Sequence, residues 1–173
     1  MTRFDAPVDL VGHDWGGNHV LNAMMHRPEL VRSWASDIVG VFDPDYVWHE
    51  VAQVWQTPGD GERLVEAMMG GTLQERVQRL AGLGVTPEVG TAMAAARGPE
   101  MGRAILLLYR SARQPAMTEA GRGLERAAAR PGLCLLATED HYVGSEEIRR
   151  RAAGRAGART DVLDGLGHWW MVE

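Results

Sequence analysis

Asp14 is the first residue of this sequence whose type and position could do chemistry. It follows the mainly apolar stretch 8–11, lies between Gly12 and Gly16, and precedes apolar residues at helical spacing. This pattern predicts a strand that turns abruptly into a helix, with Asp14 on the strained bend and a small residue two positions to either side. The spacing matches the G-x-S-x-G nucleophile elbow, with aspartate in place of serine. Asp14 is therefore either a carboxylate nucleophile or simply the N-cap of the helix.

Two further candidates, Asp140 and His168, also follow predicted strands. Asp140 lies just beyond the apolar run 133–138, and His168 lies beyond the shorter run 160–163. In open parallel sheets, ligands bind at the carboxyl ends of the strands. We therefore expect Asp14, Asp140 and His168 to converge on one site.

The elbow and the order nucleophile, acid, histidine resemble the α/β-hydrolase superfamily. An aspartate nucleophile is similar to the branch that contains epoxide hydrolases and haloalkane dehalogenases. The resemblance implies that Asp14 attacks an alkyl carbon and forms a covalent ester, that His168 activates water to hydrolyse it, and that Asp140 orients the imidazolium. It implies no metal and no cofactor. The expected substrate is a small apolar organic molecule.

Three aromatic residues are further candidates for the site, the first two through the same resemblance and Trp48 through the unusual tryptophan content of the chain. Trp15 follows the nucleophile in both enzyme families; its backbone N–H would face the oxyanion, and in the dehalogenases the equivalent indole N–H holds the halide. Tyr109 is similar to the W-Y-R tyrosine of epoxide hydrolase caps, which donates a proton to the opening epoxide, although a packed helix tyrosine is the alternative. Trp48, with other tryptophans, lines an apolar substrate cavity or belongs to the core.

The elements that must position these residues suggest three segments. Residues 1–43 form the first part of an α/β core, with the elbow strand, a helix to about His26 and a second strand around 31–39. Residues 44–131 form a helical cap insertion, and residues 132–173 complete the core. The fold class is thus α/β: a partial α/β-hydrolase fold, with a parallel sheet, flanking helices and a helical cap.

Local signals predict helix starts inside the insertion. Thr72 and Glu75 have the spacing of a capping box, and Pro87 and Pro99 suit the first position of a helix. We therefore expect three helices to begin at these points.

Composition excludes several classes of protein. A net charge of −5 and an isoelectric point near 5.7 argue against a nucleic-acid partner. No apolar run approaches the length of a membrane span, and the first residues lack a signal-peptide layout, so we expect a cytoplasmic protein that does not bind membranes. Cys134 is the single cysteine and is expected to be a buried thiol.

Relative to the superfamily, the chain is expected to be N-terminally truncated. Only 7 residues precede the elbow strand, where the superfamily has four strands and the loop with the second oxyanion donor. The elbow strand, which has the pattern of a fully buried strand, would then form an exposed edge and favour homo-oligomers.

Three functional hypotheses stay open. The first is an aspartate-nucleophile hydrolase, with an epoxide favoured over a haloalkane. The second is an ester or lactone hydrolase. The third is a non-catalytic truncated remnant that serves as a binding or assembly module.

Overall fold

The computed structural model describes residues 6–172, and four parallel strands form its sheet in the order β1-β2-β3-β4. The strands are β1 (Val8–Gly12), β2 (Val31–Ser36), β3 (Gly132–Ala137) and β4 (Arg159–Leu163). Each strand pairs in parallel with the next along the chain. All four carboxyl ends therefore meet at one edge of the sheet, as an α/β fold requires.

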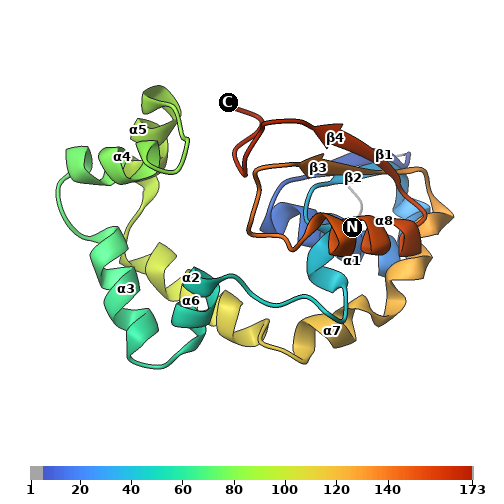
Figure 1. The fold of residues 1–173 in the computed structure, drawn as a ribbon, viewed down its shortest axis with the longest axis horizontal. Helices are drawn as coiled ribbons and strands as arrows, with labels where there is room; N and C mark the ends of the chain where they lie inside the picture. Colours follow the sequence, from blue (N-terminus) through green and yellow to red (C-terminus); the bar gives the residue numbers. More distant parts are fainter. Residues whose placement is uncertain (1–5, 173) are drawn as a thin grey trace.

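The helices fall into two groups. Those associated with the sheet are α1 (Trp15–His26), η1 (Pro28–Leu30), η2 (Val39–Phe42), α7 (Ala116–Ala120), η3 (Gly121–Ala129) and α8 (Glu146–Arg155). Between β2 and β3 the chain also forms α2 (Glu50–Gln56), α3 (Asp60–Met69), α4 (Leu73–Ala81), α5 (Pro87–Ala96) and α6 (Pro99–Ser111). Figure 1 shows this second group standing apart from the sheet, beyond the carboxyl ends of its strands. The helical insertion is therefore present, although its boundaries at 44 and 131 stay a prediction, since η3 packs back on α1.

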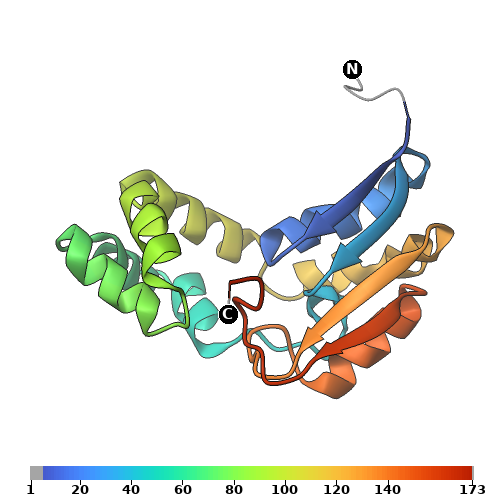
Figure 2. The same cartoon turned by 90° about the horizontal axis from the view of Figure 1, so that it is seen from above.

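The helices α1 and α8 cover the same face of the sheet, and Figures 1 and 2 show the opposite face uncovered. On the covered side, Leu21 and Met24 of α1 are completely buried. On β1, by contrast, Val11 is 75% exposed. The prediction of a fully buried elbow strand is therefore wrong: every residue of β1 is at least partly exposed, and Val11 lies on the face that no described helix covers.

Several boundaries follow the local signals. Helix α1 ends at His26, and α4 begins after Thr72, whose side chain accepts a hydrogen bond from the backbone N–H of Glu75. Pro87 and Pro99 are the first residues of α5 and α6. The second strand ends earlier than predicted, at Ser36, because its hydroxyl accepts a hydrogen bond from the N–H of Ile38 (3.3 Å) and the chain turns into η2.

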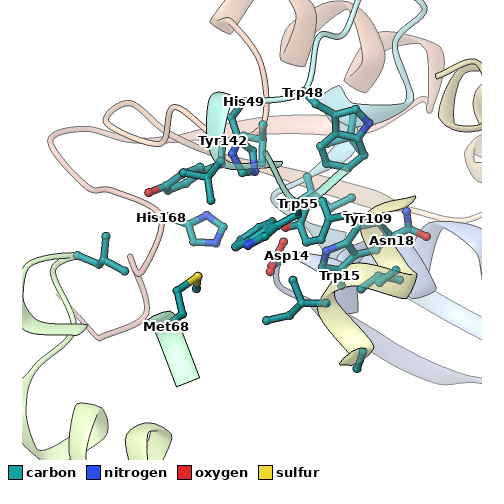
Figure 3. A pocket seen from close by; sticks show the side chains of 18 of the residues that line it. Asp14, Trp15, Asn18, Trp48, His49, Trp55, Met68, Tyr109, Tyr142 and His168 are labelled. Atoms are coloured by element: carbon teal, nitrogen blue, oxygen red, sulfur yellow. The ribbon is translucent and has the colours of Figure 1, made fainter. Parts of the chain in front are cut away.

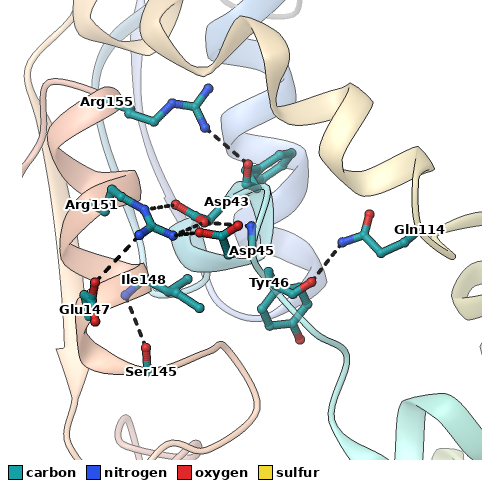
Figure 4. A network of polar contacts seen from close by, with 10 residues as sticks. Asp43, Asp45, Tyr46, Gln114, Ser145, Glu147, Ile148, Arg151 and Arg155 are labelled. Atoms are coloured by element: carbon teal, nitrogen blue, oxygen red, sulfur yellow. Dashed lines mark hydrogen bonds and ion pairs between the residues drawn. The ribbon is translucent and has the colours of Figure 1, made fainter.

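A polar network holds the chain where it leaves the sheet for the helical insertion (Figure 4). Arg151 of α8 donates two hydrogen bonds to the fully buried carboxylate of Asp43, at 2.8 and 2.6 Å, and one to Asp45 at 2.6 Å. The hydrogen bond from Arg151 lowers the pKa of Asp43. Where the chain returns from the insertion, the Gln114 amide donates to the carbonyl of Tyr46 (3.1 Å). The start of the insertion is thus fixed to α8, and its returning end is held against its start.

None of the helices within residues 6–172 is long and apolar enough to cross a membrane.

We expect the isolated chain to self-associate through β1. In the described part of the chain, β1 pairs with β2 on one side only, so a row of backbone N–H and C=O groups can pair with a second copy. Val11→Lys should then shift the protein toward monomer, because charge on an edge strand opposes pairing. Light scattering coupled to size-exclusion chromatography measures this. Leu107→Lys is the control, since Leu107 is 72% exposed but lies on α6. A wild-type monomer would contradict the expectation.

Candidate active site

Asp14 forms the bend between β1 and α1. Its backbone has φ 50° and ψ −130°, and it is the one non-glycine residue with positive φ in the described part of the chain. Its carboxylate makes no capping hydrogen bond to the helix and instead lines a cavity. Asp14 therefore occupies the N-cap position of α1, but its side chain does not cap the helix. A strained residue at the end of a strand is a common sign of a functional position.

The glycines that have no room for a Cβ are not the pair that the sequence predicts. A Cβ on Gly12 would lie 2.5 Å from the carbonyl oxygen of Gly16, and a Cβ on Gly17 would lie 2.5 Å from Ser36 Oγ. A Cβ on Gly16 would meet no atom within 4 Å. The prediction that Gly16 must be small is wrong. The close approach requires glycine at positions 12 and 17, because there the start of α1 packs against β1 and the end of β2.

Gly12→Ala should destabilise the protein by about 1–3 kcal/mol, the usual cost of overpacking a tight contact. The contact is with backbone, which cannot move aside without shifting the first turn of α1. Gly16→Ala is the matched control: it should leave stability unchanged or raise it by up to about 1 kcal/mol, because alanine is the better helix former. Urea unfolding followed by circular dichroism gives both values. Equal midpoints for the two variants would contradict the geometry.

His168 and Asp140 form a hydrogen-bonded pair beyond β4 and β3. The distance from His168 Nδ1 to Asp140 Oδ2 is 2.9 Å, and the side chains are 12% and 2% exposed. Burial alone would lower the pKa of His168, but the hydrogen bond and the charges of Asp140 and Asp14 outweigh burial and raise it. Burial likewise opposes ionisation of Asp140, but its bond to His168 keeps its pKa below the usual value. With Nδ1 engaged, Nε2 is the nitrogen left to act on a substrate or water.

The pKa of Asp14 is raised, chiefly because burial disfavours its carboxylate, while the charges of His168 and His13 oppose the rise. His168 and Asp14 both line the same cavity. The structure thus brings together the three residues that the sequence predicts, with Asp140 behind His168.

Asp37, which directly follows β2, is a polar centre that sequence reasoning missed. Its carboxylate is 2% exposed; it contacts His13 Nδ1 at 2.5 Å and accepts hydrogen bonds from the Asp14 backbone N–H at 3.1 Å and the Trp170 indole at 2.8 Å. The ring of His13 in turn lies 4.6 Å from that of His168, centroid to centroid. Asp37 therefore joins the elbow to the loop that carries His168. The sequence did contain a signal for Asp37: it follows a strand, as the three predicted site residues do.

The cavity has a volume of about 520 Å³ and is bounded mainly by aromatic and aliphatic side chains. Figure 3 shows Trp15, Trp55 and Tyr109 grouped around Asp14, with His168 nearby. Tyr109 lies between the three indoles, with ring centroids 5.3 Å from Trp15, 4.5 Å from Trp55 and 5.4 Å from Trp48. These aromatic residues form a continuous apolar wall next to the Asp14 carboxylate.

The indole N–H groups and the phenol hydroxyl of this wall differ in their hydrogen-bond partners. Trp48 lines the cavity and also belongs to the core, and its indole donates to the carbonyl of Ala112 at 2.9 Å, which joins the two ends of the insertion. The buried indole N–H groups of Trp15 and Trp55 have no hydrogen-bond acceptor within the described residues. Burial, reinforced by the charge of Asp14, raises the pKa of Tyr109 to about 12, although the nearby Trp15 indole partly offsets this. Tyr109 therefore stays a neutral phenol that can donate a proton.

His49 also lines the cavity, although its sequence context gave no sign of this. It caps α2, with Nδ1 accepting from the N–H of Ala52 at 3.2 Å, and its ring lies 4.9 Å from Tyr142. Burial lowers the pKa of His49 to about 4. It is a neutral wall residue at ordinary pH.

Comparison with known proteins shows which family and which solved structures the chain is similar to. A family model described as "Alpha/beta hydrolase family" matches residues 2–173. No curated protein sequence matches the chain. Among solved structures, the haloalkane dehalogenase DbeA from Bradyrhizobium elkani is 23% identical with a TM-score of 0.67, and the match covers 94% of this chain and 61% of that one.

Two other solved structures are similar at lower identity. The meta-cleavage product hydrolase CumD, as an A129V mutant, is 17% identical with a TM-score of 0.60, covering 96% of this chain and 60% of that one. Est816, described as an N-acyl homoserine lactone degrading enzyme, is 16% identical with a TM-score of 0.57, covering 96% and 62%. The chain thus spans about three fifths of these structures. At these identities the likeness establishes the fold alone.

Proposed function

The chain belongs to the α/β hydrolase family, and from this premise we propose that its site hydrolyses a substrate with an electrophilic alkyl carbon. The reaction proceeds through a covalent ester on Asp14, and an epoxide is the substrate that the site supports best. The observation that carries the proposal is the position of the Asp14 carboxylate. It lies on a strained bend in an apolar cavity, with the His168–Asp140 pair and the Tyr109 phenol beside it. A serine in this place would suit acyl transfer; a carboxylate suits displacement at an alkyl carbon.

The first step forms the ester. A carboxylate oxygen of Asp14 attacks an epoxide carbon, the C–O bond of the ring breaks, and the oxygen leaves as an alkoxide. Tyr109 protonates this alkoxide, because its hydroxyl is neutral and lies on the same wall of the cavity.

The second step hydrolyses the ester. His168 Nε2 takes a proton from water, and the resulting hydroxide attacks the ester carbonyl carbon. The backbone N–H of Trp15 stabilises the oxyanion, since the first residue of a helix has no intrahelical acceptor for its N–H. Collapse of the intermediate releases a diol and restores the Asp14 carboxylate, and the proton on His168 returns to the Tyr109 phenolate.

A haloalkane is the second candidate substrate, favoured by a separate observation. The indole N–H groups of Trp15 and Trp55 are buried at the cavity without acceptors in the described structure. A buried donor without an acceptor costs about 1–3 kcal/mol. A departing halide would give such an N–H an acceptor, and it leaves without needing a proton.

Isotope labelling tests the covalent route. With enzyme in excess over an epoxyalkane or a haloalkane in H₂¹⁸O, the first turnover should give a product whose new oxygen is ¹⁶O, because it comes from Asp14. The ¹⁸O should appear in the Asp14 carboxylate, where mass spectrometry of the peptide detects it. A product that carries ¹⁸O from the first turnover would show direct attack by water and overturn the proposal.

A further inference from the structure

The cavity has one cationic side chain that the reaction does not use. Arg97 lies between α5 and α6 and is the one arginine among the described residues that line the cavity. Its guanidinium has no hydrogen bond or ion pair within the described structure, and its side chain is half-buried. Burial, reinforced by the like charge of Arg79, lowers the pKa of Arg97. No residue from 6 to 172 therefore compensates this charge with a hydrogen bond or an ion pair.

The neighbouring Arg76 and Arg79, unlike Arg97, have hydrogen-bond acceptors. Arg76 donates to the carbonyls of Gly71 at 2.7 Å and Ala94 at 3.2 Å, and Arg79 donates to that of Gly70 at 2.7 Å. These two hold α4 against the ends of α3 and α5 through neutral acceptors. Arg79 adds positive potential next to Arg97, and neither arginine supplies it with a partner.

Arg97 lies at the end of the cavity away from the reacting groups. Helix α6 extends from the α4–α5 hairpin toward the strands in both views of the fold (Figures 1 and 2). Arg97 precedes its first turn, whereas Tyr109 lies in its last turn beside Asp14. The helix rise places Met101 about 12 Å from Tyr109 along the axis. The charges that shift the pKa of Asp14 come from His168, His13, Asp37 and Asp140 and not from Arg97.

The wall between the two ends is apolar. On α6 it consists of Met101, Ala104, Ile105 and Leu108. An alkyl chain laid along this wall would reach from Asp14 to the guanidinium. A carboxylate at its far end would form charge-assisted hydrogen bonds with Arg97, which a fully apolar molecule could not.

We propose that Arg97 binds the carboxylate of an elongated, amphipathic substrate: an alkanoate whose far end carries the carbon that Asp14 attacks. The assignment of the reacting end rests on the proposed function. The assignment of the anionic end does not, because it concerns binding. The substrate class is thus narrowed from a small apolar molecule to an alkyl chain with a terminal carboxylate.

Calorimetric titration with decanoate and with 1-decanol tests the anionic end without any chemistry. The wild-type chain should bind decanoate roughly ten- to a hundredfold more tightly than decanol, as expected for hydrogen bonds to a charged group. Arg97→Met keeps an apolar side chain of similar reach and should remove the difference, while Arg97→Lys should retain part of it. Arg113→Met is the control, because Arg113 is exposed and does not line the cavity.

Equal affinity of the wild type for the two probes would overturn the proposal, as would an unchanged preference in Arg97→Met. Near-ultraviolet circular dichroism shows whether Arg97→Met folds. If it does not, Arg97→Gln takes its place: loss of the preference for decanoate supports the proposal, and an unchanged preference overturns it.

Turnover separates this proposal from the proposed function. An ω-epoxyalkanoate and the epoxyalkane of equal chain length are compared on the wild-type protein. Decanoate preference without turnover of either compound would leave the Arg97 site standing and reject the hydrolase proposal. Equal turnover of both, with no preference in binding, would reject the Arg97 site and leave the hydrolase proposal standing.

Discussion

Asp14→Asn should lower the turnover of epoxide and haloalkane by roughly 10⁴–10⁶-fold, the range seen when a nucleophile is removed from a catalytic set. The amide cannot displace a leaving group, although its shape preserves the bend. Asp14→Ala should be equally inactive. Asp161→Asn, which changes an exposed carboxylate on β4, is the control and should retain activity.

His168→Gln should fail at the second step instead of the first. Glutamine cannot take a proton from water, so the ester on Asp14 should accumulate to about one equivalent of enzyme. Mass spectrometry of the digested protein should find the added mass on the peptide that contains Asp14. If wild type turns the substrate over while His168→Gln gives no adduct there, Asp14 is not the nucleophile.

Tyr109→Phe should separate the two candidate substrates. Loss of the phenol should lower epoxide turnover by roughly 10²–10⁴-fold, the usual contribution of a general acid. The same variant should process a haloalkane almost as fast as wild type, because a halide leaves without a proton. The raised pKa of Tyr109, about 12, keeps the phenol protonated across the ordinary pH range, so the epoxide reaction should show no loss from its ionisation below pH 10.

Tyr142→Phe is the matched comparison for this prediction, since Tyr142 also lines the cavity and lies 5.0 Å from the ring of His168. Steady-state rates on an epoxyalkane and a haloalkane with both variants give the result. Equal losses on both substrates in Tyr109→Phe would reduce Tyr109 to a packing residue. A large epoxide loss in Tyr142→Phe alone would make Tyr142 the proton donor.

Much of the local structure could be predicted because its causes are local. The strand–bend–helix at Asp14 follows from an apolar run that meets glycines and then changes to helical spacing. Helix α4 begins where Thr72 and Glu75 satisfy each other's backbone N–H groups, and α5 begins at Pro87. Each of these signals acts within a few residues, so the sequence contains the whole of it.

The errors arose where neighbours distant in sequence decide the outcome. Whether Gly16 or Gly17 must be small depends on the path of β2, which brings Ser36 against Gly17. Whether Val11 is buried depends on what covers that face of the sheet, and no described helix does. The end of β2 at Ser36 depends on a side-chain hydrogen bond that apolar patterning does not reveal.

By itself, the sequence determined that Asp14, Asp140 and His168 each follow a strand in the order of the α/β hydrolases, because strand ends and residue order are properties of the chain. Only the tertiary structure decided what surrounds them. Asp37 meets His13 and Trp170, which are 24 and 133 positions away, because parallel pairing brings the strand ends together. Likewise, the position of α6 beyond the carboxyl ends of the strands places Tyr109 next to Asp14 and leaves Arg97 at the far end of the same cavity. Such contacts depend on packing between distant segments, which local propensity does not encode.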